Sequence, residues 1–159
     1  MASVKKQKKI EILNRKAAFE YRFVQEYEVG MVLTGTEIKS IREGNANLND
    51  AYCDFERGEL WVRNMYIAEY SHGTDNNHEP RRKRKLLLHR QELRKLERRS
   101  SEKGFTIIPY KLYINEQGRA KLVIELAVGK KAFDKRETIK AKDDKRTLDR
   151  LRKDYNIRA

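Results

Sequence analysis

TIIPYKLYINEQGRAKLVIELAV, residues 106–128, carries the strongest strand signal in the chain. In its second half every other residue is apolar, which is the period of a β-strand that buries one face: Leu122, Ile124, Leu126 and Val128. The first half, Thr106–Ile114, is rich in β-forming residues, and the NEQG between the two halves is a hairpin signal. Pro109 lacks an amide proton, so it indicates either an edge position or a bulge. We therefore expect an antiparallel hairpin here.

Upstream stretches with the same alternation predict further antiparallel strands. One spans residues 19 to 30 or 33, with a bulge near Val24-Gln25. Ala51–Glu56 and Glu59–Ala68 are two more, joined by the tight turn Arg57-Gly58.

Two helices interrupt the strands. Thr36 is the expected N-cap of a short helix that ends at Gly44, and a second helix spans 89–103 and stops at Gly104. The total is about six antiparallel strands with two or three helices. This favours a mainly β fold, a small six-stranded β-barrel of the oligonucleotide-binding type flanked by helices.

Charge is abundant and unevenly distributed over the 159 residues, which suffice for one domain with its own core. The net charge is +13, yet residues 20–69 hold 5 Lys/Arg against 10 Asp/Glu. Residues 81–99 hold 10 Lys/Arg against 2 Glu, and residues 130–159 hold 12 against 6. A polyanion is therefore the expected partner, met by one side of the protein.

We expect three regions along the chain: a basic mobile arm (1–9), a barrel domain that would bind the polyanion (10–129) and a basic tail (130–159). The tail has few residues to bury, so it is expected to be disordered until a partner orders it. The spacing of Leu148, Leu151 and Tyr155 would suit a helix in the bound state, although a permanently disordered tail is the alternative.

No signal peptide or stretch of about 20 apolar residues occurs, which predicts a cytoplasmic protein. The lone Cys53 lies in a strand-like run and is expected to be a buried, inert thiol. No catalytic motif of the GxGxxG, GxSxG or HExxH type is present, and His72, His78 and His89 lack metal-ligand spacing. We expect no catalysis, no metal and no cofactor.

Two features suggest how a nucleic acid would be bound. The cluster from Arg81 to Lys85 precedes an apolar triplet that fixes it to the core, so it is expected to contact phosphates, although a solvated loop or a localisation-like patch would look similar. Glu28 interrupts an apolar strand, either as an ordinary solvent-side residue or as an acceptor for base edges and ribose hydroxyls.

Several separated stretches together resemble the small protein B (SsrA-binding, tmRNA-binding) family of bacterial trans-translation. They are Asn14-Arg15-Lys16-Ala17, Tyr27-Glu28-Val29-Gly30, Leu33-Thr34-Gly35-Thr36-Glu37-Ile38-Lys39-Ser40, Gly44-Asn45-Ala46-Asn47, Asn77-His78-Glu79-Pro80, Arg84-Lys85-Leu86-Leu87-Leu88 and Gly129-Lys130-Lys131-Ala132-Phe133-Asp134-Lys135-Arg136. The resemblance implies a monomer that binds the tRNA-like domain of tmRNA and delivers it, with elongation factor Tu, to stalled ribosomes. The tail would probe the empty mRNA channel.

The resemblance also implies where RNA would bind. The expected docking surface consists of Asn14, Lys16, Tyr21, Glu28, Arg81, Arg84, Lys85 and Leu87. The expected ribosome-contacting root of the tail consists of Gly129, Lys130, Lys131, Phe133, Asp134, Lys135 and Arg136. In it, Gly129 would be a flexible joint and Phe133 would stack on a base of the decoding centre.

Three other functions fit parts of the pattern. A general ribosomal or initiation-factor-like RNA-binding module would share the basic surface. An RNA-processing enzyme could use Glu28, Asp54 or His78 with Mg²⁺. A membrane-surface protein could dock its basic tail on anionic lipid, although the tail is poor in aromatic residues.

Overall fold

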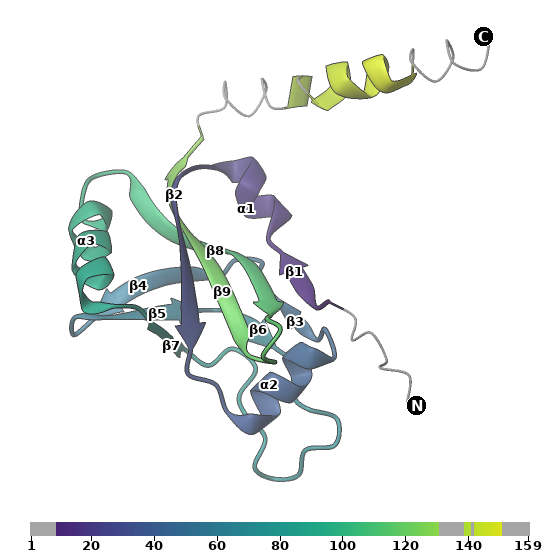
Figure 1. Ribbon diagram of the computed structural model, residues 1–159, viewed down its shortest axis with the longest axis vertical. Coiled ribbons are helices and arrows are strands. Elements are labelled where there is room, and N and C mark those ends of the chain that lie inside the picture. The colour runs from purple at the N-terminus through teal and green to yellow at the C-terminus, as the bar shows by residue number, and fades with distance from the viewer. Residues whose placement is uncertain (1–8, 131–138, 141, 151–159) are drawn as a thin grey trace.

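The computed structural model describes residues 9–130, 139–140 and 142–150 (Figure 1). The elements of the domain, in chain order, are β1 (Glu11–Leu13), α1 (Arg15–Glu20), β2 (Tyr21–Met31), α2 (Gly35–Arg42), β3 (Ala46–Asn47), β4 (Tyr52–Glu56), β5 (Glu59–Arg63), β6 (Tyr66–Ile67), β7 (Arg84–Leu87), α3 (Arg90–Ser100), β8 (Phe105–Ile114) and β9 (Ala120–Gly129). Residues 142–150 are also helical, and their side chains are exposed.

Six strands close into a ring in the order β8-β4-β5-β7-β2-β9, because β9 also pairs with β8. Every pairing in it is antiparallel. On the edge of β8 away from β9, β4 occupies the first half and β1 the second half. The prediction of a mainly β fold built on six antiparallel strands and flanked by helices is confirmed.

The two longest strand pairings contain the predicted irregularities. In β8 the register against β9 shifts between Pro109 and Lys111, so the proline marks a bulge rather than an edge. In β2 it shifts between Phe23 and Gln25, at the predicted position. Each bulge inserts one extra residue and so shifts the side-chain alternation by one position. The apolar residues before and after the bulge therefore remain on the faces where they pack.

The beginning of β2 was predicted too early. Phe19 belongs to the helix α1, which the alternation with Tyr21 concealed. The Asn14 side chain accepts a hydrogen bond from the Ala17 amide and so caps this helix.

Helix α2 begins earlier than predicted. Its N-cap is Thr34, not Thr36, because Thr34 forms a reciprocal capping box with Glu37. The strand predicted over 59–68 is divided, since Asn64 has φ of 61° and ends β5 before the short β6. The hairpin turn is as predicted, with positive φ at Arg57 and Gly58.

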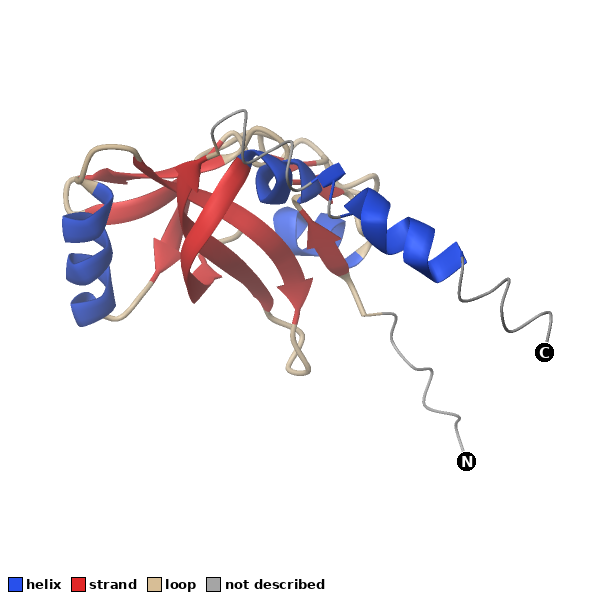
Figure 2. Cartoon of the chain, turned by 90° about the horizontal axis from the view of Figure 1, so that it is seen from above, coloured by secondary structure: helices blue, strands red, loops and turns tan. Residues whose placement is uncertain are grey.

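The core fills the ring with alternate side chains from all six strands. Cys53 lies in this core, and burial raises the pKa of its thiol well above the ordinary value. The helices α2 and α3 each insert one fully buried apolar side chain, Ile41 and Leu96 respectively. Seen from above, α3 stands at one end of the ring while α1 and β1 lie toward the other (Figure 2).

Candidate nucleic-acid interface

The outward side of β7, β2, β9 and β8 forms one continuous surface, called here the outer sheet face. On β9 the even-numbered Leu122, Ile124 and Leu126 point into the core, so the odd-numbered side chains point outward. On β2 the outward positions after the bulge are 26, 28 and 30, and on β7 they are 85 and 87. Residues distant in sequence are thereby brought side by side.

Glu28 lies exposed near the middle of the outer sheet face. Tyr113 on β8 lies near this carboxylate, on the same side of the sheet across the intervening strand β9. Burial, followed by the nearby negative charge of Glu28, raises the pKa of Tyr113 to about 12. The tyrosine therefore stays neutral at physiological pH, and the Glu28 carboxylate beside it is exposed.

Leu87 lies on the same side of the sheet as Glu28, because β7 pairs with β2 so that Leu87 faces Gly30, two residues after Glu28. The side chain of Leu87 is 50% exposed, and that of Val32 is 47% exposed. A Cβ atom at Gly30 would lie 3.5 Å from the Leu87 Cβ, in ordinary van der Waals contact. The outer sheet face therefore presents an apolar patch beside a hydrogen-bond acceptor.

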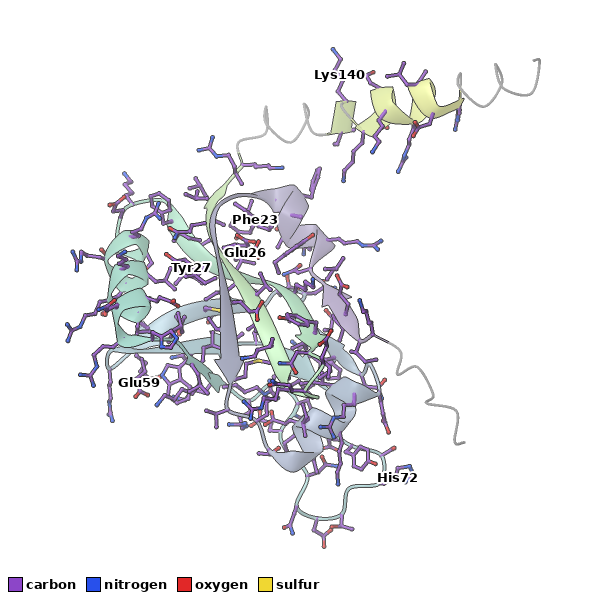
Figure 3. The ribbon with its side chains drawn as sticks, in the orientation of Figure 1. Phe23, Glu26, Tyr27, Glu59, His72 and Lys140 are labelled. Atoms are coloured by element: carbon purple, nitrogen blue, oxygen red, sulfur yellow. The ribbon has the colours of Figure 1, made fainter. Side chains whose placement is uncertain are left out.

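Tyr21 occupies the α1 end of the same face. It packs with Phe23 on a small cluster of Ala17, Ile108 and Ala127, separate from the main core. The Phe23 ring meets the Tyr110 ring edge to face, with 5.2 Å between their centroids. Figure 3 shows Phe23 and Glu26 beside β2. The aromatic side chains thus extend the outer sheet face beyond Glu28.

Lys16 lies exposed on α1, beside a cavity of about 320 Å³ that Tyr21 also lines. Its ammonium group is 3.3 Å from the carboxylate of Asp50. This ion pair is open to solvent, so it contributes little to stability and can exchange for a phosphate contact.

Two residues predicted on the RNA surface are not exposed, and the first is Asn14. Its side chain is 3% exposed. Besides capping α1, its amide nitrogen donates to the carbonyls of Leu48, at 3.2 Å, and Pro109, at 3.0 Å. Asn14 therefore holds the start of α1 against β8, and its polar atoms are used within the protein.

The second is Arg84, which was predicted to contact phosphate. Both Arg84 and Glu37 are 0% exposed, and they form a buried ion pair. The Arg84 guanidinium also donates to the carbonyls of Met65, at 2.7 Å, and Pro80, at 3.1 Å. Because side chains alternate along β7, Arg84 points inward and its neighbours in the basic cluster point outward.

Glu37 is the acid at the centre of this buried network. Burial raises its pKa, but hydrogen bonds from Arg82, the Thr34 amide and Arg84 outweigh that effect, so the pKa lies below its ordinary value. The network ties α2 to β7 and to the loop before it.

The exposed cations of the basic cluster already have partners within the protein. Lys85 pairs with Glu59 at 2.9 Å. Arg81 donates to the backbone carbonyl and the side chain of Asn64, and its guanidinium lies over the Tyr66 ring. Both groups remain accessible for phosphate, with their geometry fixed in advance.

The sequence analysis missed several residues of the outer sheet face. They are Phe23, Glu26, Tyr110, Lys111, Tyr113 and Lys121, while Glu125 points to the same side but is only 4% exposed. Most stand at outward positions of the β8–β9 hairpin or of β2, and the alternation that identified the core could have identified them by exclusion. Burial, with the charge and hydrogen bond of Glu26, raises the pKa of Glu125 to about 7.

The residues considered for Mg²⁺-dependent catalysis, Glu28, Asp54 and His78, are not grouped into a metal site in the described part of the chain. Asp54 is paired with Arg63 at 2.6 Å, and His78 is hydrogen-bonded to Thr36 and the Ile67 carbonyl. Among residues 9–130, 139–140 and 142–150, no three His, Cys, Asp or Glu side chains are grouped in a way that could hold a metal ion. None of the helices described is long and apolar enough to cross a membrane.

Of the predicted tail root, the structure describes Gly129 and Lys130. The Lys130 amide donates to the Glu20 carbonyl at 2.9 Å, so the chain leaves the domain next to the end of α1. Lys131, Phe133, Asp134, Lys135 and Arg136 lie outside the described residues, as does the predicted basic arm up to residue 8.

Comparison with known proteins gives consistent matches. The family model described as "SmpB protein" matches residues 11–154. An SsrA-binding protein of Phocaeicola vulgatus is 60% identical over 142 residues, covering 89% of this chain and 95% of the relative. One of Bacteroides thetaiotaomicron is 56% identical over 146 residues, covering 92% and 97%. A solved structure described as "tmRNA-SmpB: a journey to the center of the bacterial ribosome" is 47% identical, with a TM-score of 0.66, and the match covers 77% of this chain and 86% of that chain.

Proposed function

Because the chain belongs to the SmpB protein family, we propose that it binds the tRNA-like domain of tmRNA and acts in trans-translation. The observation that carries this proposal is the outer sheet face, on which the exposed Glu28 carboxylate and the half-exposed Leu87 lie on the same side of paired strands. A general phosphate-binding protein would need neither feature, since both suit the base and ribose groups of a shaped RNA.

In the proposed complex, the Glu28 carboxylate accepts hydrogen bonds from base edges or ribose hydroxyls. Leu87 and Val32 cover the apolar face of an unstacked nucleotide. The exposed cations Lys16, Arg81 and Lys85 exchange their present partners for phosphate oxygens, and this contact adds affinity without sequence preference.

Asn14 and Arg84 support the site in a different way. Both are buried, so we assign them to holding α1, α2 and β7 in place rather than to contacting RNA. Their loss would change the shape of the outer sheet face through the elements that they connect.

The proposal for the tail follows from family membership. Residues 130–159 would enter the empty mRNA channel of a stalled ribosome, with Gly129 as the joint and Phe133 stacked on a base of the decoding centre. The helical residues 142–150 would lie along the channel. The protein would act in the cytoplasm as a monomer, deliver tmRNA together with elongation factor Tu, and catalyse no reaction itself.

The test is the affinity of the Glu28→Gln variant for the tRNA-like domain. We expect a loss of about tenfold or more, because an amide accepts more weakly than a charged carboxylate. Glu116→Gln is the matched control, since it removes the same charge from the exposed β8–β9 turn. Equal affinities for the unmodified protein and both variants would exclude Glu28 from the interface.

A further inference from the structure

Two carboxyl groups are buried in the described part of the chain, and only one of them has cations beside it. Glu37 is 0% exposed and forms ion pairs with Arg82 and Arg84. Glu125 is 4% exposed on β9, with its side chain on the side of the outer sheet face. Among residues 9–130, 139–140 and 142–150, no ion pair joins Glu125 to a cation. Glu125 therefore lacks the compensation that Glu37 has.

The residue directly opposite Glu125 on β2 is another carboxyl. Glu26, which Figure 3 labels, is exposed and is the partner of Glu125 in the register of β2 with β9. Directly opposed positions on neighbouring strands place their Cβ atoms about 5 Å apart, where like charges are destabilising. On the other side of β9, the partner of Glu125 on β8 is the apolar Ile108. Neither cross-strand neighbour compensates a negative charge on Glu125.

The two lysines of the surrounding strands do not supply the missing cation. Lys111 on β8 is the nearer one by strand register, but its ammonium group lies 3.4 Å from the carboxylate of Glu11 on β1. Lys121 lies four residues before Glu125 on β9, which is about 13 Å along the strand. Both lysines are therefore placed away from Glu125.

The remaining ionisable groups around Glu125 come from β2, β8 and the neighbouring helix α1, which packs here through Ala17. They are Glu28 on β2, Tyr110 and Tyr113 on β8, and Arg15, Lys16, Glu20 and the following Tyr21 at α1. Of the two cations in this set, Lys16 is paired with Asp50. In the part of the chain that the structure describes, neither cation forms an ion pair with Glu125.

A buried carboxyl in such surroundings holds its proton more strongly than an exposed one. Burial, followed by the negative charge of Glu26, raises the pKa of Glu125 to about 7. Because the two groups interact, the proton belongs to both of them together, and we call Glu26 and Glu125 the carboxyl pair. At pH 7 the carboxyl pair therefore carries a proton in about half of the free molecules.

The carboxyl pair lies next to the acceptor that is proposed for RNA. Glu26 and Glu28 are two residues apart on β2 and point to the same side, so they are separated by about 7 Å along the strand. The screening length at physiological salt is about 8 Å. An RNA that contacts Glu28 therefore acts on the carboxyl pair through a field that salt screens only in part, and its negative charge disfavours ionisation of the pair.

A proton suits this position better than a divalent cation. Glu125 is 4% exposed, and Mg²⁺ gives up its water reluctantly, whereas a proton needs no room. Among residues 9–130, 139–140 and 142–150, no three His, Cys, Asp or Glu side chains are grouped so that they could hold a metal ion.

We propose that the carboxyl pair takes up a proton from solvent when RNA binds at the outer sheet face. This inference rests on the proposed function, because it takes the same surface as the RNA site. In the complex the carboxyl pair carries one negative charge instead of two, and the protonated carboxyl is a hydrogen-bond donor for an RNA oxygen. The affinity for RNA should therefore fall as pH rises through 7.

The first test is the affinity of the full chain for the tRNA-like domain at pH 6, 7 and 8 and one salt concentration. We expect the unmodified protein to bind about five- to tenfold more weakly at pH 8 than at pH 6, as for a pKa of about 7 in the free protein and about 8 or above in the complex. Glu125→Gln replaces the carboxyl by a neutral amide of the same shape, so this ratio should be at least about threefold smaller. Glu116→Gln removes the same charge from the exposed β8–β9 turn and should keep the full ratio.

The second test counts the protons by calorimetry at pH 7 in two buffers that differ in ionisation enthalpy. The unmodified protein should take up about 0.4 proton more per complex than Glu125→Gln, because about half of the free carboxyl pairs are already protonated. Glu26→Gln removes the neighbouring charge, so it should move the midpoint of the pH dependence to lower pH. Glu26 is exposed, so this variant also tests the proposal if Glu125→Gln does not fold.

Equal pH dependence, or equal proton uptake, in the unmodified protein and Glu125→Gln would overturn the proposal. So would an affinity that rises with Mg²⁺ concentration in the unmodified protein but not in Glu125→Gln, since a divalent cation would then neutralise the carboxyl pair. Failure of the proposed function would look different, because the unmodified protein would show no preference for the tRNA-like domain over ordinary tRNA at any pH.

Discussion

Replacing Arg84 by methionine tests the buried ion pair with Glu37. Methionine keeps much of the apolar volume but removes the cation, so the Glu37 carboxylate remains buried with only Arg82 and the Thr34 amide as partners. The carbonyls of Met65 and Pro80 also lose a donor. Removing one partner of a buried pair costs about 3–5 kcal/mol, so we expect a loss of that size at pH 7.5.

The loss should depend on pH. In the unmodified protein the Glu37 pKa is lowered, so this carboxyl stabilises the fold above its ordinary pKa, and that contribution is lost as pH falls. Without Arg84 the buried carboxylate is poorly compensated, its pKa rises, and protonation relieves the penalty. The destabilisation by Arg84→Met should therefore be smaller at pH 4 than at pH 7.5.

Urea unfolding of both proteins at the two pH values gives the free energies directly. Lys85→Met is the matched control, since its ammonium pairs with Glu59 near the surface and should cost no more than about 1 kcal/mol. A loss below about 1 kcal/mol for Arg84→Met, or an equal loss at both pH values, would refute the reasoning.

Two further predictions concern the neighbouring carboxyls of Glu125 and Glu26 and the C-terminal tail. Because the folded pKa of Glu125 is raised to about 7, its proton stabilises the fold below the ordinary pKa, and this contribution of about 1–3 kcal/mol is lost as pH rises through 7. Urea midpoints at pH 5 and 8 should differ less for Glu125→Gln than for the unmodified protein, and equal differences would exclude this role. Deleting residues 137–159 should leave affinity for the tRNA-like domain intact but abolish tagging in a reconstituted translation system, and normal tagging by the shortened protein would contradict a channel-probing tail.

The alternation of apolar residues predicted the long strands and the bulge in β2, whereas Pro109 left either an edge position or a bulge open for β8. The alternation failed at Phe19, which alternates with Tyr21 as a strand residue would but lies in α1. The helix there depends on Asn14. Its side-chain oxygen caps α1, and its side-chain nitrogen donates to carbonyls that are 34 and 95 residues away in the chain. Contacts this distant leave no local signal in the chain.

The candidate site was only partly accessible to sequence reasoning for the same reason. A run of five basic residues does not show which one points inward, and the pairing of β7 with β5 and β2 decides that it is Arg84. Glu28 was noticed because it interrupts an apolar strand, and the resemblance to a family then placed both Glu28 and Leu87 on the expected surface. Their proximity to each other and to Tyr113 follows from the pairing of strands far apart in sequence.

The most direct test of the proposed function is a titration of the full chain against the tRNA-like domain of tmRNA and against an ordinary tRNA, each at two salt concentrations. If the outer sheet face reads a shaped RNA, the tRNA-like domain should bind more tightly, and the preference should persist at the higher salt. If the net charge of +13 acts alone, both RNAs should bind equally and weaken together as salt rises. That second result would contradict the proposal.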